Sequence, residues 1–337
     1  MADHDPPAVE PAPPAIPGTV RRTIDHDGVA LSVLDAGEGS PVVLAHGFPE
    51  LAYSWRHQFG ALADAGCRVL AADGRGYGRT PGPEALEDYD IEHLIGDQLA
   101  LLDDIGEERA VFVGHDWGAI VVWNLAWAHP ERVAGVVGMS VPFVPRGALP
   151  PTQFMRQALG DMFFYMLYFQ EPGVADADLG ADPATTMRRM LGGVSTEGGS
   201  GPDPSFFAND GRGFVERMPE PAALPDWLSQ AELDAYVGEF ERTGFTGGVN
   251  WYRNLDRNWE LTEHLAERKV EVPSLFIGGG ADPVLLMSPP STMDGWVTDH
   301  RGDVIVPGAG HWVQQQSPDE VNAALVEFIG SVRGEGS

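Results

Sequence analysis

The sequence is poor in cysteine and in basic side chains. Cys67 is its only cysteine, which excludes an internal disulfide framework and favours a small core residue over a nucleophile. Lysine and arginine together number 21 against 50 aspartates and glutamates, so the formal net charge at pH 7 is −29. This charge argues against nucleic acid and anionic membrane surfaces as partners.

Long apolar runs are also missing. No stretch of the sequence is apolar over enough residues to span a bilayer. Residues 1–18 are acidic and rich in proline and alanine, and they lack the basic and apolar regions of a signal peptide. We therefore expect a disordered tail at 1–18 and a cytoplasmic protein that does not insert into membranes.

What the sequence does contain is an alternation of short apolar runs and amphipathic stretches. The runs at 41–45, 67–72, 110–113 and 133–139 have the length and composition of strands buried on both faces. Helical patterns lie between them, which predicts a mostly parallel α/β sheet flanked by helices. With 337 residues, 43% of them hydrophobic, the chain can form one large α/β unit plus an accessory domain.

The strand pattern stops after residue 142. Aromatic-rich helical patterns at 152–169, 183–191 and 224–243 replace it, which predicts a helical cap inserted into the sheet. A stretch rich in glycine, proline and serine lies within the cap at 192–221. We interpret it as a long loop and hypothesise that it is a mobile gate.

The alternation of strands and helices resumes after residue 260. Strands are expected at 274–277 and 304–306, with a helix at 287–297 between them. The predicted organisation is a tail at 1–18, a first core segment at 19–142, a helical cap at 143–260 and a second core segment at 261–337.

The segment around residue 116 has the pattern of a strand, a sharp turn and a helix. Gly114 and Gly118 flank Asp116, as expected where a strained backbone pushes one side chain forward. The usual centre of such a nucleophile elbow is serine, which attacks carbonyl groups. A carboxylate is already ionised near neutral pH, and its attack on a saturated carbon gives an ordinary ester. Asp116 therefore predicts epoxide opening or halide displacement, followed by hydrolysis of the ester.

Two further candidates follow later strands, at the carboxyl edge where open parallel sheets bind ligands. Asp282 and His311 each come after a glycine-rich strand end, in the order nucleophile, acid, histidine. We predict that Asp282 orients His311 and that His311 takes a proton from the hydrolytic water. The structural alternatives are a turn or helix cap for Asp282 and a satisfied loop histidine for His311.

The loop 46–49, His-Gly-Phe-Pro, follows the first buried strand. We predict that the backbone N–H groups of Phe48 and Trp117 form an oxyanion hole for the tetrahedral intermediate. A tight turn after the strand is compatible with this role. The sequence leaves open whether the peptide bond before Pro49 is cis.

Four motifs stand out in the core and in the cap. They are His46-Gly-Phe-Pro-Glu50 with Tyr53-Ser-Trp55, Gly114-His-Asp-Trp-Gly118, Tyr165-Met-Leu-Tyr-Phe-Gln-Glu-Pro-Gly173 and Asn250-Trp-Tyr-Arg-Asn254. Together they resemble the soluble epoxide hydrolases of the α/β-hydrolase fold, over residues 24 to 329. The two cap motifs are the specific part, because dehalogenases share the elbow. The resemblance implies an α/β-hydrolase fold with an α-helical cap domain and the activity of an epoxide hydrolase.

The resemblance further implies that two cap tyrosines, Tyr165 and Tyr252, hydrogen-bond the epoxide oxygen. A phenol with a pKa near 10 stays protonated at neutral pH, so it can donate a proton to the developing alkoxide. The alternatives are an aromatic packing stripe for Tyr165 and interface packing for Tyr252. Tyr168 is the reserve candidate if Tyr165 points elsewhere.

Glu50 and His115 match positions that, by the same resemblance, help to hold the hydrolytic water. The alternatives are that Glu50 caps the following helix and that His115 packs under the elbow. No cofactor and no metal is expected. The glycine-dense loop at 73–78 is interpreted as a turn and not as a phosphate cradle, because no helix start with a lysine follows it.

Two other functions stay open. A haloalkane dehalogenase would also use Asp116 and would bind halide with the indole of Trp117, but it would leave the paired cap tyrosines without a purpose. A non-catalytic ligand-binding relative would be favoured by the loss of a catalytic residue, and nucleophile, acid and histidine are all present. The cap aromatics suggest an apolar epoxide, aryl or fatty-acyl, as the small-molecule substrate. The sequence does not determine the oligomeric state, so a homodimer also stays open.

Overall fold

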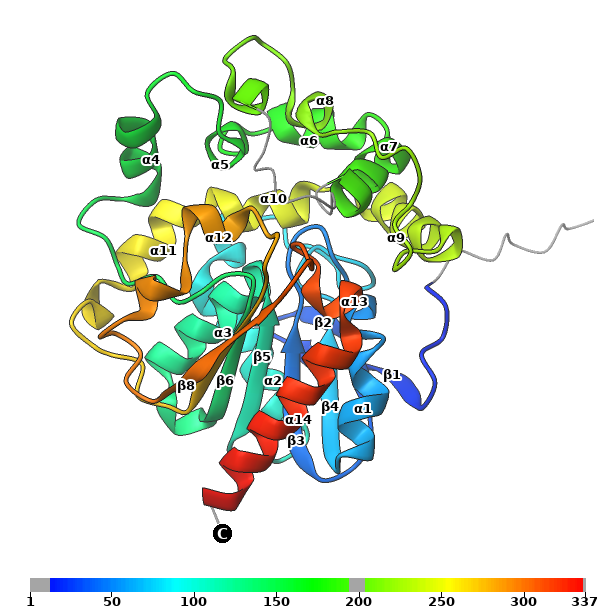
Figure 1. The fold of residues 1–337 in the computed structure, drawn as a ribbon, viewed down its shortest axis with the longest axis vertical. Helices are drawn as coiled ribbons and strands as arrows, with labels where there is room; N and C mark the ends of the chain where they lie inside the picture. The colour runs from blue at the N-terminus through cyan, green and yellow to red at the C-terminus, as the bar shows by residue number, and fades with distance from the viewer. Residues whose placement is uncertain (1–12, 194–203, 336–337) are drawn as a thin grey trace, which may run out of the picture.

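The structure, a computed structural model, describes residues 13–193 and 204–335. Eight strands of these residues form one sheet in the order β1-β2-β4-β3-β5-β6-β7-β8 (Figure 1). β1 pairs with β2, and β2 with β4, in antiparallel orientation, whereas all neighbours from β4 to β8 are parallel. The strands are β1 (Thr19–His26), β2 (Val29–Ala36), β3 (Ser40–Ala45), β4 (Cys67–Ala72), β5 (Ala110–His115), β6 (Val133–Met139), β7 (Ser274–Gly279) and β8 (His300–Val306).

Helices cover both faces of the sheet. α1 (Gln58–Asp64) packs against α14 (Pro318–Glu335) in front of the sheet in Figure 1, and α2 (Ile91–Asp104) packs against α3 (Trp117–Ala128) behind it. Every residue of the central strand β5 is buried, which explains its continuous apolar composition. The short core elements are α12 (Val284–Met287), α13 (Val313–Gln316) and 3-10 turns at Ala52–Trp55, Leu86–Tyr89, Pro130–Arg132, Glu263–Leu265 and Pro290–Met293.

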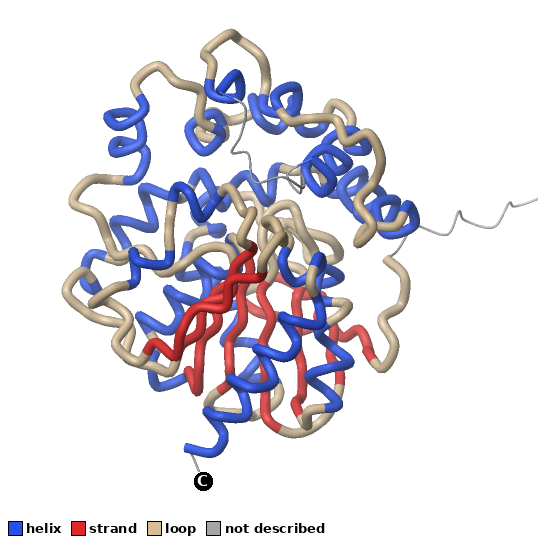
Figure 2. The backbone as a smooth tube through the Cα atoms, viewed as in Figure 1, coloured by secondary structure: helices blue, strands red, loops and turns tan. Residues whose placement is uncertain are grey.

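Between β6 and β7 the chain leaves the sheet and forms a helical cap over the carboxyl ends of the parallel strands (Figures 1 and 2). We propose 143 and 260 as the limits of this cap, with the core divided into 19–142 and 261–337. The cap contains α4 (Pro151–Leu159), α5 (Tyr165–Tyr168), α6 (Val174–Gly180), α7 (Pro183–Arg188), a π-helical turn (Arg189–Gly193), a 3-10 turn (Pro204–Phe207), α8 (Phe214–Arg217), α9 (Gln230–Thr243), α10 (Thr246–Arg253) and α11 (Leu255–Leu261).

Two predicted helices are wrong, one in its extent and the other altogether. The helix expected at 152–169 is divided into α4 and α5, because the chain turns at Gly160, whose φ of 57° is left-handed. The helix expected at 287–297 does not form. Pro289 and Pro290 cannot donate backbone hydrogen bonds, so α12 ends before them and only a 3-10 turn follows.

The cap helix expected at 224–243 starts later than predicted, as α9. Its start is fixed by a capping box, in which the hydroxyl of Ser229 accepts the N–H of Glu232 and the carboxylate of Glu232 accepts the N–H of Ser229 at 2.8 Å. Such reciprocal bonds satisfy backbone groups that a helix end leaves unpaired, so they determine where the helix begins.

Part of the predicted disordered tail is folded. Ile16 is buried against the core, and its carbonyl oxygen accepts the N–H of Thr19 at 3.2 Å. The prediction is therefore wrong for residues 13–18, while residues 1–12 lie outside the described residues. Over the ranges that the structure describes, no helix is both long and apolar enough to cross a membrane.

The predicted gate at 192–221 also lies partly outside the described residues, which omit 194–203. Its described part contains the 3-10 turn after residue 203 and α8, and Phe214 and Met218 are buried in the cap. The idea of a mobile gate stays a hypothesis.

Candidate active site

The backbone at residue 116 makes the sharp turn that the glycine pattern predicts. β5 ends one residue before Asp116 and α3 begins one residue after it, and Asp116 has a φ of 51°. A Cβ on Gly114 would lie 2.1 Å from the carbonyl oxygen of Gly118, and a Cβ on Gly118 would lie 1.9 Å from the last carbonyl of β3. Both positions therefore require glycine, and the turn projects Asp116 beyond the end of the strand.

The two oxygens of the Asp116 carboxylate have different neighbours. Oδ1 accepts a hydrogen bond of 2.8 Å from the backbone N–H of Phe48, and the backbone N–H of Trp117 faces the same carboxylate. Oδ2 lies 3.7 Å from Nε2 of His311. Burial raises the pKa of Asp116, and the neighbouring histidines and N–H groups oppose that rise. The loop that supplies the Phe48 N–H contains a cis peptide bond before Pro49.

His311 lies between the carboxylates of Asp116 and Asp282. Its Nδ1 is 3.1 Å from Oδ2 and 3.3 Å from Oδ1 of Asp282. Burial disfavours the imidazolium, but Asp282 and then Asp116 and Glu50 raise the pKa of His311 to about 9. Asp282 also accepts the N–H of Val284 at 2.9 Å, so the predicted histidine partner and the turn alternative are both present in one side chain, whereas the helix cap of α12 is Pro283.

Two cap tyrosines lie near enough to this carboxylate for its charge to act on them. The ring centroids of Tyr165 and Tyr252 are 5.9 Å apart, and the ring of Tyr252 packs edge-on against Phe48 at 5.4 Å and Trp117 at 5.1 Å. Burial and the negative charge of Asp116 raise the pKa of both phenols. Both hydroxyls are therefore protonated at neutral pH.

The reserve candidate Tyr168 is directed elsewhere. Its hydroxyl donates a hydrogen bond of 3.2 Å to Oδ2 of Asp178, the same oxygen that accepts the N–H groups at the start of α8. Burial and Asp178 raise the pKa of Tyr168 to about 12. Of the two tyrosines on α5, only Tyr165 is close to Tyr252.

Glu50 and His115 form a buried pair beneath the nucleophile. Nδ1 of His115 lies 2.6 Å from Oε2 of Glu50, and Nε2 lies 2.7 Å from the carbonyl oxygen of His311. Burial opposes the charge on Glu50, but His115 lowers the pKa of its carboxyl to about 2. The other donors to Glu50 are the N–H of Gly47 (2.9 Å) and the side-chain amides of Gln314 (2.8 Å) and Gln315 (3.3 Å).

This arrangement differs from the helix-cap alternative for Glu50, whereas its predicted part in holding the hydrolytic water stays a prediction. Each oxygen of Glu50 accepts two protein hydrogen bonds, which occupies the roughly four acceptor positions of a carboxylate. Its partners do not include the start of the following helix, so the predicted cap is wrong. Glu50 instead connects the loop after β3, the end of β5 and α13.

Comparison with known proteins agrees with this geometry. Residues 40–318 match the family model described as alpha/beta hydrolase fold. The chain is 58% identical to epoxide hydrolase A of Mycobacterium tuberculosis over 310 residues, which covers 91% of this chain and 96% of that protein. It belongs to the epoxide hydrolase family of the α/β-hydrolase fold.

Solved structures of this family superpose on the chain over nearly its whole length. The crystal structure of epoxide hydrolase A from Mycobacterium thermoresistibile has a TM-score of 0.88 at 56% identity and covers 92% of this chain and 98% of its own. An epoxide hydrolase from an endophytic Streptomyces has a TM-score of 0.90 at 40% identity and covers 94% of this chain and 97% of its own. The predicted fold, a mostly parallel sheet with a helical cap, is confirmed.

Sequence reasoning missed one side chain that the structure places at this epoxide hydrolase site. The hydroxyl of Ser140 donates a hydrogen bond of 2.8 Å to the carbonyl oxygen of His311, beside the bond from His115. Ser140 directly follows β6, at the same sheet edge as Asp116, and that position was the available signal. Among the described residues, no group of three or more His, Cys, Asp and Glu side chains is placed to hold a metal ion.

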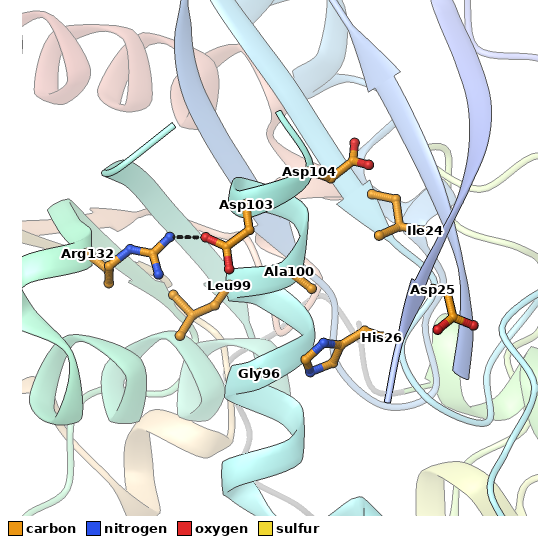
Figure 3. A pocket seen from close by; sticks show the side chains of 9 residues that line it. All are labelled: Ile24, Asp25, His26, Gly96, Leu99, Ala100, Asp103, Asp104 and Arg132. Carbon is orange, nitrogen blue, oxygen red and sulfur yellow. Dashed lines mark hydrogen bonds and ion pairs between the residues drawn. The ribbon is translucent and has the colours of Figure 1, made fainter. Parts of the chain in front are cut away.

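A surface hollow of about 470 Å³ lies away from this site, between β1 and α2 (Figure 3). Its polar lining includes Asp25 and His26 and an ion pair between Asp103 and Arg132. None of the residues that line it is a predicted site residue, so we assign it no part in the chemistry.

Proposed function

We propose that this epoxide hydrolase converts an apolar epoxide and water to a vicinal diol through an ester on Asp116. The observation that carries the proposal is the environment of one carboxylate. Its Oδ1 is held by the N–H of Phe48, its Oδ2 faces His311, and two protonated phenols lie near it. The nucleophile Asp116, the base His311 and the two tyrosine acids are therefore gathered at one site.

In the first step, Oδ2 of Asp116 attacks a ring carbon of the epoxide and the carbon–oxygen bond of the ring breaks. Tyr165 and Tyr252 hydrogen-bond the ring oxygen and supply the proton that the developing alkoxide needs. Oδ1 becomes the carbonyl oxygen of the ester. It already lies against the N–H of Phe48, so the group that binds the later oxyanion is in place before reaction.

In the second step, His311 removes a proton from water, which attacks the ester carbonyl carbon. The negative charge then develops on Oδ1 and is stabilised by the N–H groups of Phe48 and Trp117. Asp282 holds the imidazole through Nδ1 and stabilises the imidazolium that forms. Collapse of the tetrahedral intermediate expels the diol oxygen, which takes the proton from His311. The proton left on the Asp116 carboxyl returns to the tyrosine that gave one in the first step, so the enzyme is restored.

We further propose that Glu50 and His115 hold the catalytic loops in place and do not themselves bind the hydrolytic water. Both oxygens of Glu50 and both ring nitrogens of His115 are already engaged with protein groups. We retain an apolar small-molecule substrate, a cytoplasmic location and the absence of nucleic-acid and membrane partners as proposals.

A haloalkane dehalogenase fits the site less well. The indole N–H of Trp117, which would bind halide, is directed at the hydroxyl of Tyr252, where it favours the ionised phenol. In a dehalogenase the indole would already bind the departing halide, so the two phenols near Asp116 would have no further atom to which they could donate. The tyrosine pair therefore favours epoxide opening.

The test of the proposed function is product analysis with styrene oxide, trans-stilbene oxide and 1-bromobutane. We expect diol from an epoxide and no halide release. In a single turnover in H2(18)O, the diol should be unlabelled and the label should appear in Asp116, because water attacks the ester carbonyl carbon. Halide release without diol would establish the dehalogenase instead, and label in the first-turnover diol would exclude the ester.

The charge on Asp116 also predicts a pH effect. Asp116 helps to raise the pKa of His311 to about 9, so His311 is protonated at neutral pH in the free enzyme. Ester formation removes that charge, so the pKa of His311 should fall and free it to act as a base.

In an NMR titration, Asp116→Asn should lower the His311 midpoint below that of the wild type. Hydrolysis of the ester should speed up with rising pH through the lowered midpoint. An unchanged midpoint in Asp116→Asn would contradict this coupling.

A further inference from the structure

The proposed function gives no role to the glycine-dense loop 73–78. This loop follows β4 and lies against α10, the cap helix that carries Tyr252. We propose that Gly247 and Gly248, in the first turn of α10, form with this loop a seat that fixes the position of Tyr252 near Asp116. The inference rests on the proposed function, because it assigns these glycines to the epoxide-opening step.

The first contact of the seat is between two backbones. A Cβ on Gly247 would lie 2.6 Å from both the Cα and the carbonyl oxygen of Gly76, and a Cβ on Gly76 would lie 2.6 Å from the Cα of Gly247. Gly76 also has a φ of 78°, which other residues rarely adopt. Helix and loop therefore approach as closely as they do only because both residues lack a side chain.

The second contact is between α10 and two buried rings. A Cβ on Gly248 would lie 2.5 Å from the hydroxyl oxygen of Tyr77 and 2.7 Å from Cδ2 of Phe48. The Tyr77 ring is fully buried and packs edge-on against His46 at 4.9 Å, so it has little room to move. Phe48 is the residue whose N–H holds Asp116. The helix thus rests directly on the loop that binds the nucleophile.

The same face of α10 continues to Tyr252. Residues four apart lie one above the other on a helix, so Gly247 is aligned with Trp251 and Gly248 with Tyr252. The indole of Trp251 donates to the carbonyl oxygen of Arg75 at 3.3 Å, and a Cβ on Gly74 would lie 2.7 Å from that indole. The helix is therefore in contact with the loop along the face that ends in the tyrosine.

Two adjacent glycines in a helical first turn are unfavourable for helix formation, so close packing is the physical reason for them here. Ordinary carbon contacts are about 3.5–4.0 Å, so an added Cβ would move α10 or its neighbours by about 1 Å. A misplacement of about 1 Å at a reacting group can cost about 100-fold in rate. The displaced group would be the hydroxyl that donates to the epoxide.

The test follows formation and decay of the alkyl-enzyme by rapid-quench intact mass, with trans-stilbene oxide as the substrate. We expect Gly247→Ala and Gly248→Ala each to slow ester formation by about 10- to 100-fold. Ester hydrolysis, which depends on His311 and Asp282, should stay within about 2-fold of the wild type. When either glycine variant is combined with Tyr252→Phe, ester formation should be no slower than in Tyr252→Phe alone.

Gly60→Ala in α1 is the matched control, because a Cβ there meets no atom within 4 Å, and it should leave both rates unchanged. Gly248→Ala, whose Cβ would first meet side-chain atoms and not backbone, carries the test if Gly247→Ala does not fold. Three outcomes would overturn the proposal. They are ester formation at the wild-type rate in the glycine variants, equal slowing of ester formation and ester hydrolysis, and the same loss of rate when the glycine variants are made in the Tyr252→Phe background. Failure of the wild type itself to form an ester would instead overturn the proposed function.

Discussion

Replacement of His311 by Gln is expected to leave the enzyme able to open an epoxide but nearly unable to release the diol. Asp116 is already ionised and needs no base to attack, whereas water does need one. A general base of this kind is worth about 10²–10⁴ in rate, so ester hydrolysis should slow by about that factor. With trans-stilbene oxide, intact mass should show one substrate added to the protein, and peptide mapping should place it on Asp116.

The control for this experiment is Asp116→Ala combined with His311→Gln, which should acquire no added mass at the elbow. An adduct that forms and disappears at the wild-type rate in His311→Gln would show that His311 is not the base. An adduct on another residue would remove Asp116 as the nucleophile. Steady-state diol formation should fall in parallel with the hydrolysis rate, because that step then limits turnover.

The second large effect is expected for the double variant Tyr165→Phe/Tyr252→Phe. Without a phenol to stabilise the ring oxygen, the alkoxide would form in a buried site with no proton donor, so ester formation should slow by about 10²–10⁴. Each single variant should lose less, because the other hydroxyl still donates. The rate of ester formation in single-turnover experiments measures this effect directly.

Tyr168→Phe is the matched control for the tyrosine pair. It removes a hydroxyl from the same helix as Tyr165, but that hydroxyl donates to Asp178 and not toward the nucleophile. Its rate of ester formation should therefore equal that of the wild type. A larger loss for Tyr168→Phe than for Tyr165→Phe would show that the reserve candidate was the better assignment.

The sequence alone was sufficient to predict the buried strands of the sheet and the sharp turn at Asp116. Continuous apolar runs predict strands buried on both faces; β5 is buried throughout and β6 at all but one residue. Glycines on both sides of Asp116 predict a turn with no space for side chains, and the distances at Gly114 and Gly118 show that this space is absent. These features are local, because a few consecutive residues specify them.

The resemblance favoured Tyr165 over Tyr168, but only the tertiary structure shows where each of the two side chains lies. The two lie three residues apart on one short helix, and a break at Gly160 that the helical pattern concealed separates that helix from α4. Which tyrosine faces Tyr252 depends on how α5 packs against α10 and α8, and no local pattern records that packing.

Glu50 and the glycine loop show the same limit. Glu50 receives its hydrogen bonds from its own loop, from the end of β5 and from α13. The role we propose for it rests on the absence of a spare acceptor position, and this can be judged only when every donor is known. The sequence of the loop 73–78 indicates only an ordinary turn, and its contact with α10 is seen only in the folded chain. Periodicity and residue chemistry specify elements and reactive groups, whereas contacts between distant segments decide which group meets which, because they depend on the packing of the whole chain.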